Sequence, residues 1–147
     1  MERKVAVVTG GAGGIGAAVS RAFVSEGTSV TIADMDRDAS AKLAKELNAD
    51  NEGSALGLQV EVTDEHSVNS VVQSTIEAFG RIDFLVHCAG NNGRQSNARQ
   101  DGQCLALLAL FETVTDLYSD LMGGMGESQN IRRCLCFEYA GIFCYYG

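Results

Sequence analysis

The sequence predicts an α/β protein with a Rossmann-like, doubly wound parallel sheet, and three observations carry this prediction. A short apolar strand, residues 5–8, runs directly into a glycine-rich turn and then into an apolar helix. Strand-like and helix-like segments then alternate up to residue 87, an order that implies parallel strands joined by right-handed crossovers. Asp34 ends the second strand. We expect four strands and three helices in an incomplete sheet, followed by a further helix and a β-prone tail.

The glycine-rich turn has glycines at positions 10, 11, 13, 14 and 16. Gly11, Gly13 and Gly16 satisfy the G-x-G-x-x-G dinucleotide fingerprint in its strand–turn–helix context. Because glycine lacks a Cβ, the backbone can turn at positive φ and approach a pyrophosphate closely. The helix behind the turn, with Ile15 near its start, offers unpaired N–H groups and the positive end of its dipole to the same anion. The alternative, a glycine-rich surface loop, does not explain the flanking strand and helix.

Asp34 lies 20 residues after Gly14 (34 − 14 = 20), the separation at which an acidic side chain meets an adenine ribose. A carboxylate there accepts hydrogen bonds from both ribose hydroxyls and repels a 2′-phosphate. Arg37 is the only basic residue near it in the sequence, so NAD is predicted rather than NADP. The alternative role for Asp34 is a helix N-cap, for which Asp36 is the better candidate.

The remaining elements follow from hydrophobic periodicity and from capping residues. Gly27 closes the first helix, Asp64 caps a helix that runs to about Phe79, and Gly80 ends that helix. An amphipathic helix is expected over residues 39–47, and strands are expected over residues 29–33, 56–62 and 82–87.

The sequence changes character after about residue 93, so we divide it into a dinucleotide-binding half, 1–93, and a divergent tail, 94–147. Apolar residues at 3–4 spacing predict an amphipathic helix over about 103–122, which either covers the sheet or forms an interface with another subunit. Residues 131–139 and 142–146 are β-prone and are separated by Ala140-Gly141. They predict a hairpin or a replacement strand beside the fourth strand, which would otherwise be an exposed edge.

Composition narrows the partners. The formal net charge of −8 argues against binding to nucleic acid or to an anionic membrane surface. The sequence has neither a basic-then-apolar leader nor an apolar run long enough for a membrane span, so a soluble, cytoplasmic protein is expected. Five cysteines are an odd count, and Cys134-x-Cys136 lacks zinc-knuckle spacing, so neither a disulfide framework nor a metal site is predicted.

Several motifs in register resemble the short-chain dehydrogenase/reductase family from about Arg3 to about Gly93. The glycine turn matches the family pattern TGxxxGxG, and two later segments resemble its Asp-Val and Asn-Asn-Ala-Gly motifs. Glu61 replaces the family's adenine-contacting aspartate, and His87 and Cys88 replace its two asparagines. The resemblance implies an oxidoreductase with a dinucleotide cofactor. The matching residues are Thr9-Gly10-x-x-x-Gly14-x-Gly16, Glu61-Val62-Thr63-Asp64 and His87-Cys88-Ala89-Gly90.

Together, the motifs and the resemblance give a set of expected cofactor contacts. They lie in the turn, after the second and third strands and after the fourth strand. The expected residues are Thr9, Gly10, Gly11, Gly14, Ile15, Gly16, Asp34, Glu61, Val62, Cys88, Ala89 and Gly90.

The catalytic pair that the resemblance implies, Tyr-x-x-x-Lys, has no counterpart in these 147 residues. Lysine occurs only at 4, 42 and 45, and the residues four positions after Tyr118 and Tyr139 are Met122 and Phe143. We therefore expect an NAD-binding protein of this family without dehydrogenase turnover and name no catalytic residue. The alternatives are a non-catalytic oligomerisation partner of a full-length relative, acting through the helix 103–122, or a truncated or frame-shifted dehydrogenase product.

Overall fold

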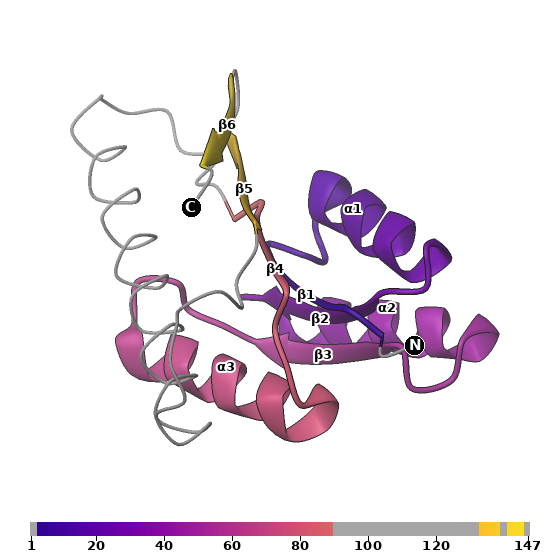
Figure 1. Ribbon diagram of the computed structural model, residues 1–147. Helices are drawn as coiled ribbons and strands as arrows, with labels where there is room; N and C mark the ends of the chain where they lie inside the picture. Colours follow the sequence, from indigo (N-terminus) through magenta and orange to yellow (C-terminus); the bar gives the residue numbers. More distant parts are fainter. Residues whose placement is uncertain (1–2, 90–132, 139–140, 146–147) are drawn as a thin grey trace, which may run out of the picture.

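The computed structural model describes residues 3–89, 133–138 and 141–145. Six strands form one sheet in the order β3-β2-β1-β4-β5-β6 (Figure 1). The strands are β1 (Val5–Thr9), β2 (Ser29–Asp34), β3 (Ala55–Gln59), β4 (Phe84–His87), β5 (Arg133–Glu138) and β6 (Gly141–Tyr145), and the helices are α1 (Gly14–Ser25), α2 (Arg37–Asp50) and α3 (Glu65–Phe79).

The pairing of the strands confirms the predicted parallel sheet. β1 pairs with β2 and with β4, and β2 pairs with β3, in each case in parallel. The chain therefore builds outward from β1 to β3, crosses back and resumes at β4 on the other side of β1. This reversal of strand order places the topological switch point between β1 and β4, where ligands of doubly wound proteins bind beyond the carboxyl ends of the strands.

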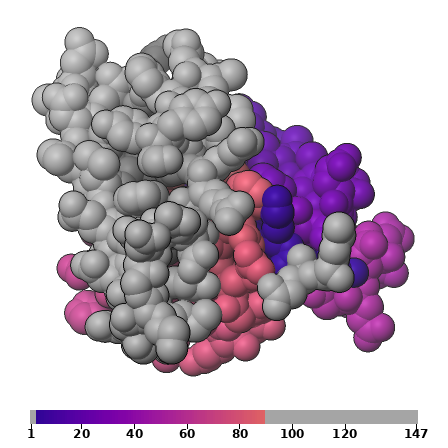
Figure 2. Space-filling model, in the orientation of Figure 1, coloured from indigo at the N-terminus to yellow at the C-terminus, as the bar shows by residue number. Residues whose placement is uncertain are grey.

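Helices cover both faces of this sheet. On one face, α1 and α2 pack on a core that includes Val8, Ile32 and Val86, all 0% exposed. On the other face, α3 packs on a second core that includes Val7 and Leu85. The space-filling view shows the purple surface of α1 and α2 on the right-hand side of the molecule (Figure 2). Strands buried on both faces explain the unbroken apolar runs in the sequence.

The helix ends follow the local signals. Asp36 caps α2 by accepting a hydrogen bond from Ala39 N at 3.0 Å, and Asp64 caps α3 by accepting one from His66 N at 3.1 Å. Gly80 ends α3 with φ 79°. At the end of α1, Gly27 also has φ 79°. Its N–H bonds to Val24 O, and that of Thr28 bonds to Phe23 O, which together make a Schellman motif.

Two strands are shorter than the sequence indicates. β3 ends at Gln59 rather than at residue 62, because its neighbour β2 ends at Asp34 and the last bond between them is Val60 N to Asp34 O at 2.8 Å. β4 begins at Phe84 rather than at residue 82. Sequence periodicity marks buried residues, but a strand also needs a partner at each position, and the partner strand sets its length.

The β-prone tail supplies the missing neighbour of β4. β5 pairs with β4 in parallel, and β6 pairs with β5 antiparallel, so the tail gives both the hairpin and the replacement strand that the sequence predicts. The strands observed, 133–138 and 141–145, lie within two residues of the predicted segments, 131–139 and 142–146. The predicted helix 103–122 lies outside the described residues.

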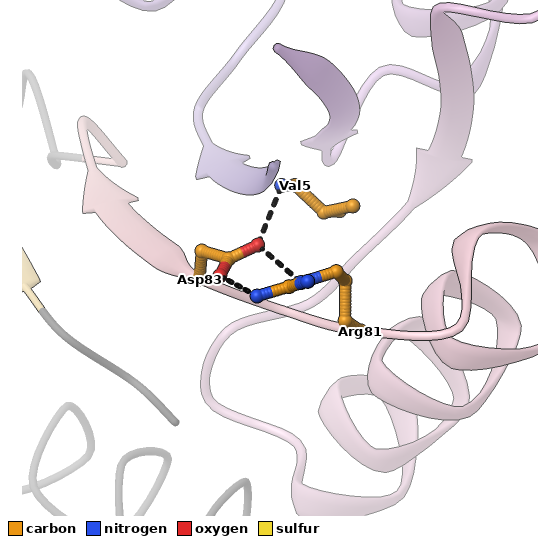
Figure 3. A network of polar contacts seen from close by, with 3 residues as sticks. All are labelled: Val5, Arg81 and Asp83. Atoms are coloured by element: carbon orange, nitrogen blue, oxygen red, sulfur yellow. Dashed lines mark hydrogen bonds and ion pairs between the residues drawn. The ribbon is translucent and has the colours of Figure 1, made fainter. Parts of the chain in front are cut away.

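A polar network fastens the amino ends of β1 and β4 (Figure 3). Asp83, 4% exposed, accepts hydrogen bonds from Val5 N at 2.9 Å and from Arg81, whose Nε and terminal nitrogen lie 2.8 and 2.6 Å from the two carboxylate oxygens. The Asp83 N–H also donates to Val5 O at 2.8 Å. The bidentate pair holds the start of β4 against the start of β1, at the opposite end of the strands from the switch point.

Among the described residues, none of the helices has the length and apolar composition that a membrane crossing requires.

Candidate functional site

The carboxyl ends of β1, β2 and β4 bring together most of the residues that the sequence predicts for a dinucleotide. The turn after β1 touches the end of β2 through Ala33 and Asp34 and the segment after β4 through Ala89. Glu61 and Val62 follow β3, one strand further out. Gly90 lies outside the described residues.

Three glycines of the turn are required by close packing. A Cβ at Gly16 would lie 2.0 Å from Gly10 O, and a Cβ at Gly11 would lie 2.7 Å from Val8 O. Gly10 combines φ 63° with a backbone approach in which a Cβ would lie 2.6 Å from Ala89 N. Distances this short leave no room for any side chain, so the turn can lie against the start of α1 and the end of β4 only with glycine here.

Gly14 differs from these three glycines. A Cβ at Gly14 would meet no atom within 4 Å among the described residues. Packing inside the protein therefore does not explain the absence of a side chain, whereas a ligand lying against the first turn of α1 would.

The backbone amides of the turn fall into two groups. Four donate hydrogen bonds inside the protein: Gly11 N to Ala33 O (3.3 Å), Ala12 N to Asp34 Oδ2 (3.0 Å), Gly13 N to Gly10 O (3.2 Å) and Ala17 N to Gly13 O (2.6 Å). The three between them, at Gly14, Ile15 and Gly16, have no acceptor among the described residues. The first turn of α1 carries no acidic residue and its N-cap makes no side-chain bond. Gly14 and Ile15 are exposed and Gly16 is buried, so at least the first two donors, with the positive end of the helix dipole, lie at an accessible surface beside Gly14.

The Asp34 carboxylate joins the turn to the loop after β2. Its Oδ2 accepts from Ala12 N at 3.0 Å, and its Oδ1 accepts from Asp36 N at 3.1 Å. The alternative interpretation of Asp34 as the N-cap of α2 is wrong, because Asp36 fills that position. Each carboxylate oxygen has two lone-pair directions, so both can still accept a hydroxyl proton.

The residues after β3 form a compact polar corner. Glu61 Oε1 accepts hydrogen bonds from the Thr63 hydroxyl at 2.7 Å and from Thr63 N at 3.3 Å, and Glu61 N donates to Ser67 Oγ at 2.9 Å. Val62 is partly buried against the core beneath α3. The longer Glu61 side chain therefore folds back onto its own loop, a contact that the comparison with an aspartate did not predict.

Two large apolar side chains are exposed beside the turn. Ile15, 58% exposed, belongs to the first turn of α1, and Met35, 65% exposed, directly follows Asp34. They are the exposed large hydrophobic residues that the described part of the chain contains. The sequence analysis missed Met35. Its signal was an apolar residue between two aspartates at the end of a strand, where a loop is otherwise polar.

The end of β4 is joined to the end of β1 by a buried pair. Thr9 Oγ1 lies 2.5 Å from His87 Nδ1, and Cys88 N donates to Thr9 O at 2.9 Å. Burial lowers the pKa of His87 from 6.5 to about 4, so the imidazole is neutral at neutral pH. Cys88 is half-buried and packs against the core beneath α1. The pair holds the end of β4 close to the turn, with Ala89 against Gly10.

This arrangement fits a dinucleotide. The open space at Gly14, the three adjoining donors and the Asp34 carboxylate match a pyrophosphate and a ribose, which need donors and an acceptor respectively. The described residues contain no group of three or more His, Cys, Asp or Glu side chains that could hold a metal ion. The arrangement can bind and orient a ligand, and its ionisable groups include the carboxylates, a neutral imidazole and the Cys88 thiol.

Comparisons with known proteins all lead to one family. The family model for short chain dehydrogenase matches residues 4–111, beyond residue 93, where the motifs quoted above stop. The chain is 43% identical over 111 residues to the short-chain dehydrogenase fogB of Aspergillus ruber, covering 73% of this chain and 38% of that protein. It is 44% identical over 89 residues to the uncharacterized oxidoreductase YuxG of Bacillus subtilis, covering 60% of this chain and 13% of that one.

Solved structures agree with this assignment. Sorbitol-6-phosphate 2-dehydrogenase SrlD from Erwinia amylovora superposes with a TM-score of 0.65 at 30% identity, covering 80% of this chain and 48% of that chain. L-sorbose reductase from Gluconobacter frateurii, solved with NADPH and L-sorbose, gives a TM-score of 0.68 at 27% identity, covering 78% and 47%. This chain thus spans less than half the length of these four relatives.

Proposed function

The chain belongs to the short-chain dehydrogenase family, and we propose that residues 3–89 bind NAD, chiefly through its ADP-ribose half. Proteins of this family bind an NAD(P) dinucleotide. The observation that carries the proposal is the row of three amides, Gly14 to Gly16, that have no acceptor among the described residues, with open space beside Gly14 and the Asp34 carboxylate at the end of the next strand.

Each part of the ligand has a matching group. The amides of Gly14, Ile15 and Gly16 would hold the pyrophosphate, and the lone pairs of Asp34 not used by Ala12 and Asp36 would accept the adenine-ribose hydroxyls. The exposed Met35 side chain, with Glu61 and Val62, would meet the adenine. When bound, the nicotinamide supplies a hydride acceptor or donor. The residues Ile15, Cys88, Ala89 and Gly90 are those we assign to that end.

The preference for NAD over NADP rests on charge. A 2′-phosphate would lie against the Asp34 carboxylate, and two further carboxylates, Asp36 and Asp38, stand at the start of α2 beside the only basic residue nearby, Arg37. One relative of the same fold was solved with NADPH, so the fold alone does not select the cofactor. We assign the selection to Asp34 and its acidic surroundings.

We further infer that these 147 residues do not transfer a hydride by the family's own route. A tyrosine hydroxyl has a pKa near 10 and needs a nearby fixed positive charge to act as a proton carrier at neutral pH. No lysine follows Lys45 in the sequence, so no Tyr-x-x-x-Lys pair is available within it. Membership of the family implies an oxidoreductase.

We propose the same division of the chain as the sequence predicts, into a dinucleotide-binding half, 1–93, and a divergent tail, 94–147. The rival function, an oligomerisation partner, depends on the helix predicted over residues 103–122, which lies outside the described residues. No contact in the described part of the chain favours it. The cytoplasmic location expected from the sequence also stays a prediction.

Calorimetric titration with NAD, NADP and ADP-ribose tests the proposal. We expect NAD and ADP-ribose to bind equally well, and NADP to bind at least about tenfold more weakly because of the charge repulsion at Asp34. Gly14→Val should fold, since its Cβ enters open space, but should lose all three ligands. Asp34→Ala should weaken the binding of NAD and reduce the difference in affinity between NAD and NADP.

Three results would count against parts of the proposal. Absence of binding by the wild-type protein would refute it outright. NADP binding as tightly as NAD would refute the assignment to Asp34. Tighter binding of NAD than of ADP-ribose would show that the nicotinamide is held as well, and the inference of no hydride transfer would then need a direct assay with alcohols.

A further inference from the structure

We propose that Asp34 also positions the phosphate-binding turn, through Ala12, so that binding of the diphosphate depends on it even when the ligand has no ribose hydroxyls. This inference rests on the proposed function, which gives Asp34 the ribose. The observation behind it is the hydrogen bond from Ala12 N to Asp34 Oδ2 at 3.0 Å, between residues 22 apart in the sequence.

The turn has few other attachments to β2. A backbone bond, Gly11 N to Ala33 O, is long at 3.3 Å, and the shorter bond is the one to the carboxylate. Hydrogen bonds to an ionised acceptor are about twice as strong as neutral ones. On the other side, the turn meets the end of β4 through the close approach of Gly10 to Ala89, a steric contact. Asp34 therefore supplies the main polar attachment of the turn to its neighbouring strand.

The carboxylate is itself held in one orientation. Asp36 N donates to Oδ1 at 3.1 Å, while Oδ2 faces Ala12. Asp36 in turn caps α2 by accepting from Ala39 N at 3.0 Å. The start of α2, the end of β2 and the glycine turn are thus joined in series, and Asp34 is half-buried at the centre of the series.

This bond also determines which amides remain for a ligand. With Ala12 N bonded to Asp34, the amides of Gly11, Ala12 and Gly13 are all satisfied inside the protein, and those of Gly14, Ile15 and Gly16 are left together. Without the carboxylate, the half-buried Ala12 N–H would lose its acceptor. The turn would then rotate to find a new acceptor, and the three donors would no longer be aligned before a ligand arrives.

The test uses ADP and 2′,3′-dideoxy-ADP, which lacks the hydroxyls that Asp34 would contact directly. We expect Asp34→Ala to weaken dideoxy-ADP about tenfold, the effect of losing one hydrogen bond that aligns the site, and to weaken ADP further. Asp34→Asn removes the same charge and keeps one acceptor oxygen for the two N–H donors of Ala12 and Asp36, so its affinity for dideoxy-ADP should lie between those of the wild type and Asp34→Ala. Asp38→Ala, which removes a neighbouring exposed carboxylate that makes no hydrogen bond within the described part of the chain, is the matched control and should leave dideoxy-ADP binding unchanged.

A ligand-free measurement gives an independent readout. Amide hydrogen exchange at Ala12 should be slow in the wild type, intermediate in Asp34→Asn and fastest in Asp34→Ala. Equal affinity of dideoxy-ADP for the wild type, Asp34→Asn and Asp34→Ala, with only ADP weakened, would overturn this inference and leave the proposed function standing. Unchanged exchange at Ala12 in Asp34→Ala would overturn it as well. If wild-type protein bound neither ADP nor NAD, the proposed function and this inference would both fail.

Discussion

The strands β1 and β4 are fastened to each other at both ends, and the two ends use different chemistry. At the amino ends, the buried Asp83 carboxylate bonds to Val5 N and takes a bidentate pair from Arg81 (Figure 3). At the carboxyl ends, the neutral side chains of Thr9 and His87 join the two strands through one hydrogen bond. The residue that follows Thr9 is Gly10, the first of the glycine turn. The first end satisfies these donors and acceptors inside the protein, whereas the second leaves three amides with no acceptor in the part of the chain that the structure describes.

This difference separates stability from function within one pair of strands. A buried carboxylate needs every partner it has, because an unpaired buried charge is costly, so the amino end has nothing left to offer a ligand. At the carboxyl end, the amides of the exposed residues Gly14 and Ile15 have no acceptor within the described part of the chain and can bind an anion. Changes at the amino end should therefore alter folding and leave ligand affinity alone, while changes at the carboxyl end should alter ligand affinity, and stability as well where the changed residue is closely packed.

The largest expected effect comes from Gly16→Val at the carboxyl end. Its Cβ would lie 2.0 Å from Gly10 O, a backbone atom that cannot move without breaking the turn. We expect the free energy of unfolding to fall by roughly 4 kcal/mol, at the upper end for a single substitution, and binding of ADP-ribose to be lost. Urea denaturation and calorimetry measure the two effects.

Gly14→Ala is the matched control for this prediction. Its Cβ meets nothing within 4 Å among the described residues, so stability should stay within about 0.5 kcal/mol of the wild type. If Gly14→Ala and Gly16→Val folded equally well, the explanation of the glycine turn by close packing would be wrong.

The second effect concerns pH and His87. Burial lowers the pKa of His87 from 6.5 to about 4, so between these values the unfolded chain takes up a proton that the folded chain excludes. The stability that depends on a neutral His87 is therefore fully present above pH 6.5 and is lost as the pH falls toward 4. Over this range the free energy of unfolding should fall by about 3 kcal/mol. Denaturation series at several pH values should show this slope, and His87→Asn should flatten it.

The other histidine, His66, provides the control for that series. It is exposed in the first turn of α3. His66→Gln should keep the slope between pH 6.5 and 4, so an equal loss of slope in both variants would contradict the assignment to His87.

The third and smallest effect is expected at the amino end. Asp83→Ala leaves Val5 N without its side-chain acceptor and removes the carboxylate from Arg81, whose side chain is 34% exposed against 6% for Asp83. Since Arg81 reaches solvent, we expect a loss of about 2 kcal/mol rather than the larger cost of a fully buried pair. Affinity for ADP-ribose, measured under conditions where the variant is folded, should not change.

The exposed ion pair Arg21–Glu46, between α1 and α2, offers a comparison. Its side chains are 53% and 46% exposed, so Glu46→Ala should produce no measurable change in stability.

A fall in ligand affinity for Asp83→Ala would show that the two ends of the β1–β4 pair are coupled, contrary to the separation of stability from ligand binding that we propose.

Much of the fold was predictable because its signals are local. The Asp36 and Asp64 caps, the Gly80 helix end and the strand–turn–helix around Gly16 depend on residues within a few positions of one another. The bounds of β3 and β4 were less predictable, since each strand ends where its neighbour ends. For the site, the spacing of Asp34 from the turn was readable, but the side chain of Glu61 folding onto Thr63 and the exposure of Met35 were not.

The sequence by itself determined the alternation of strands and helices, the glycine turn and an acidic residue after the second strand. Tertiary structure alone decided that Asp34 bonds to Ala12, that His87 meets Thr9 across 78 positions, and that β5 takes the place beside β4. The physical reason is that turns and caps are governed by short-range sterics and hydrogen bonds, which the local sequence specifies. Contacts between distant segments exist only once strand order and register have placed them side by side.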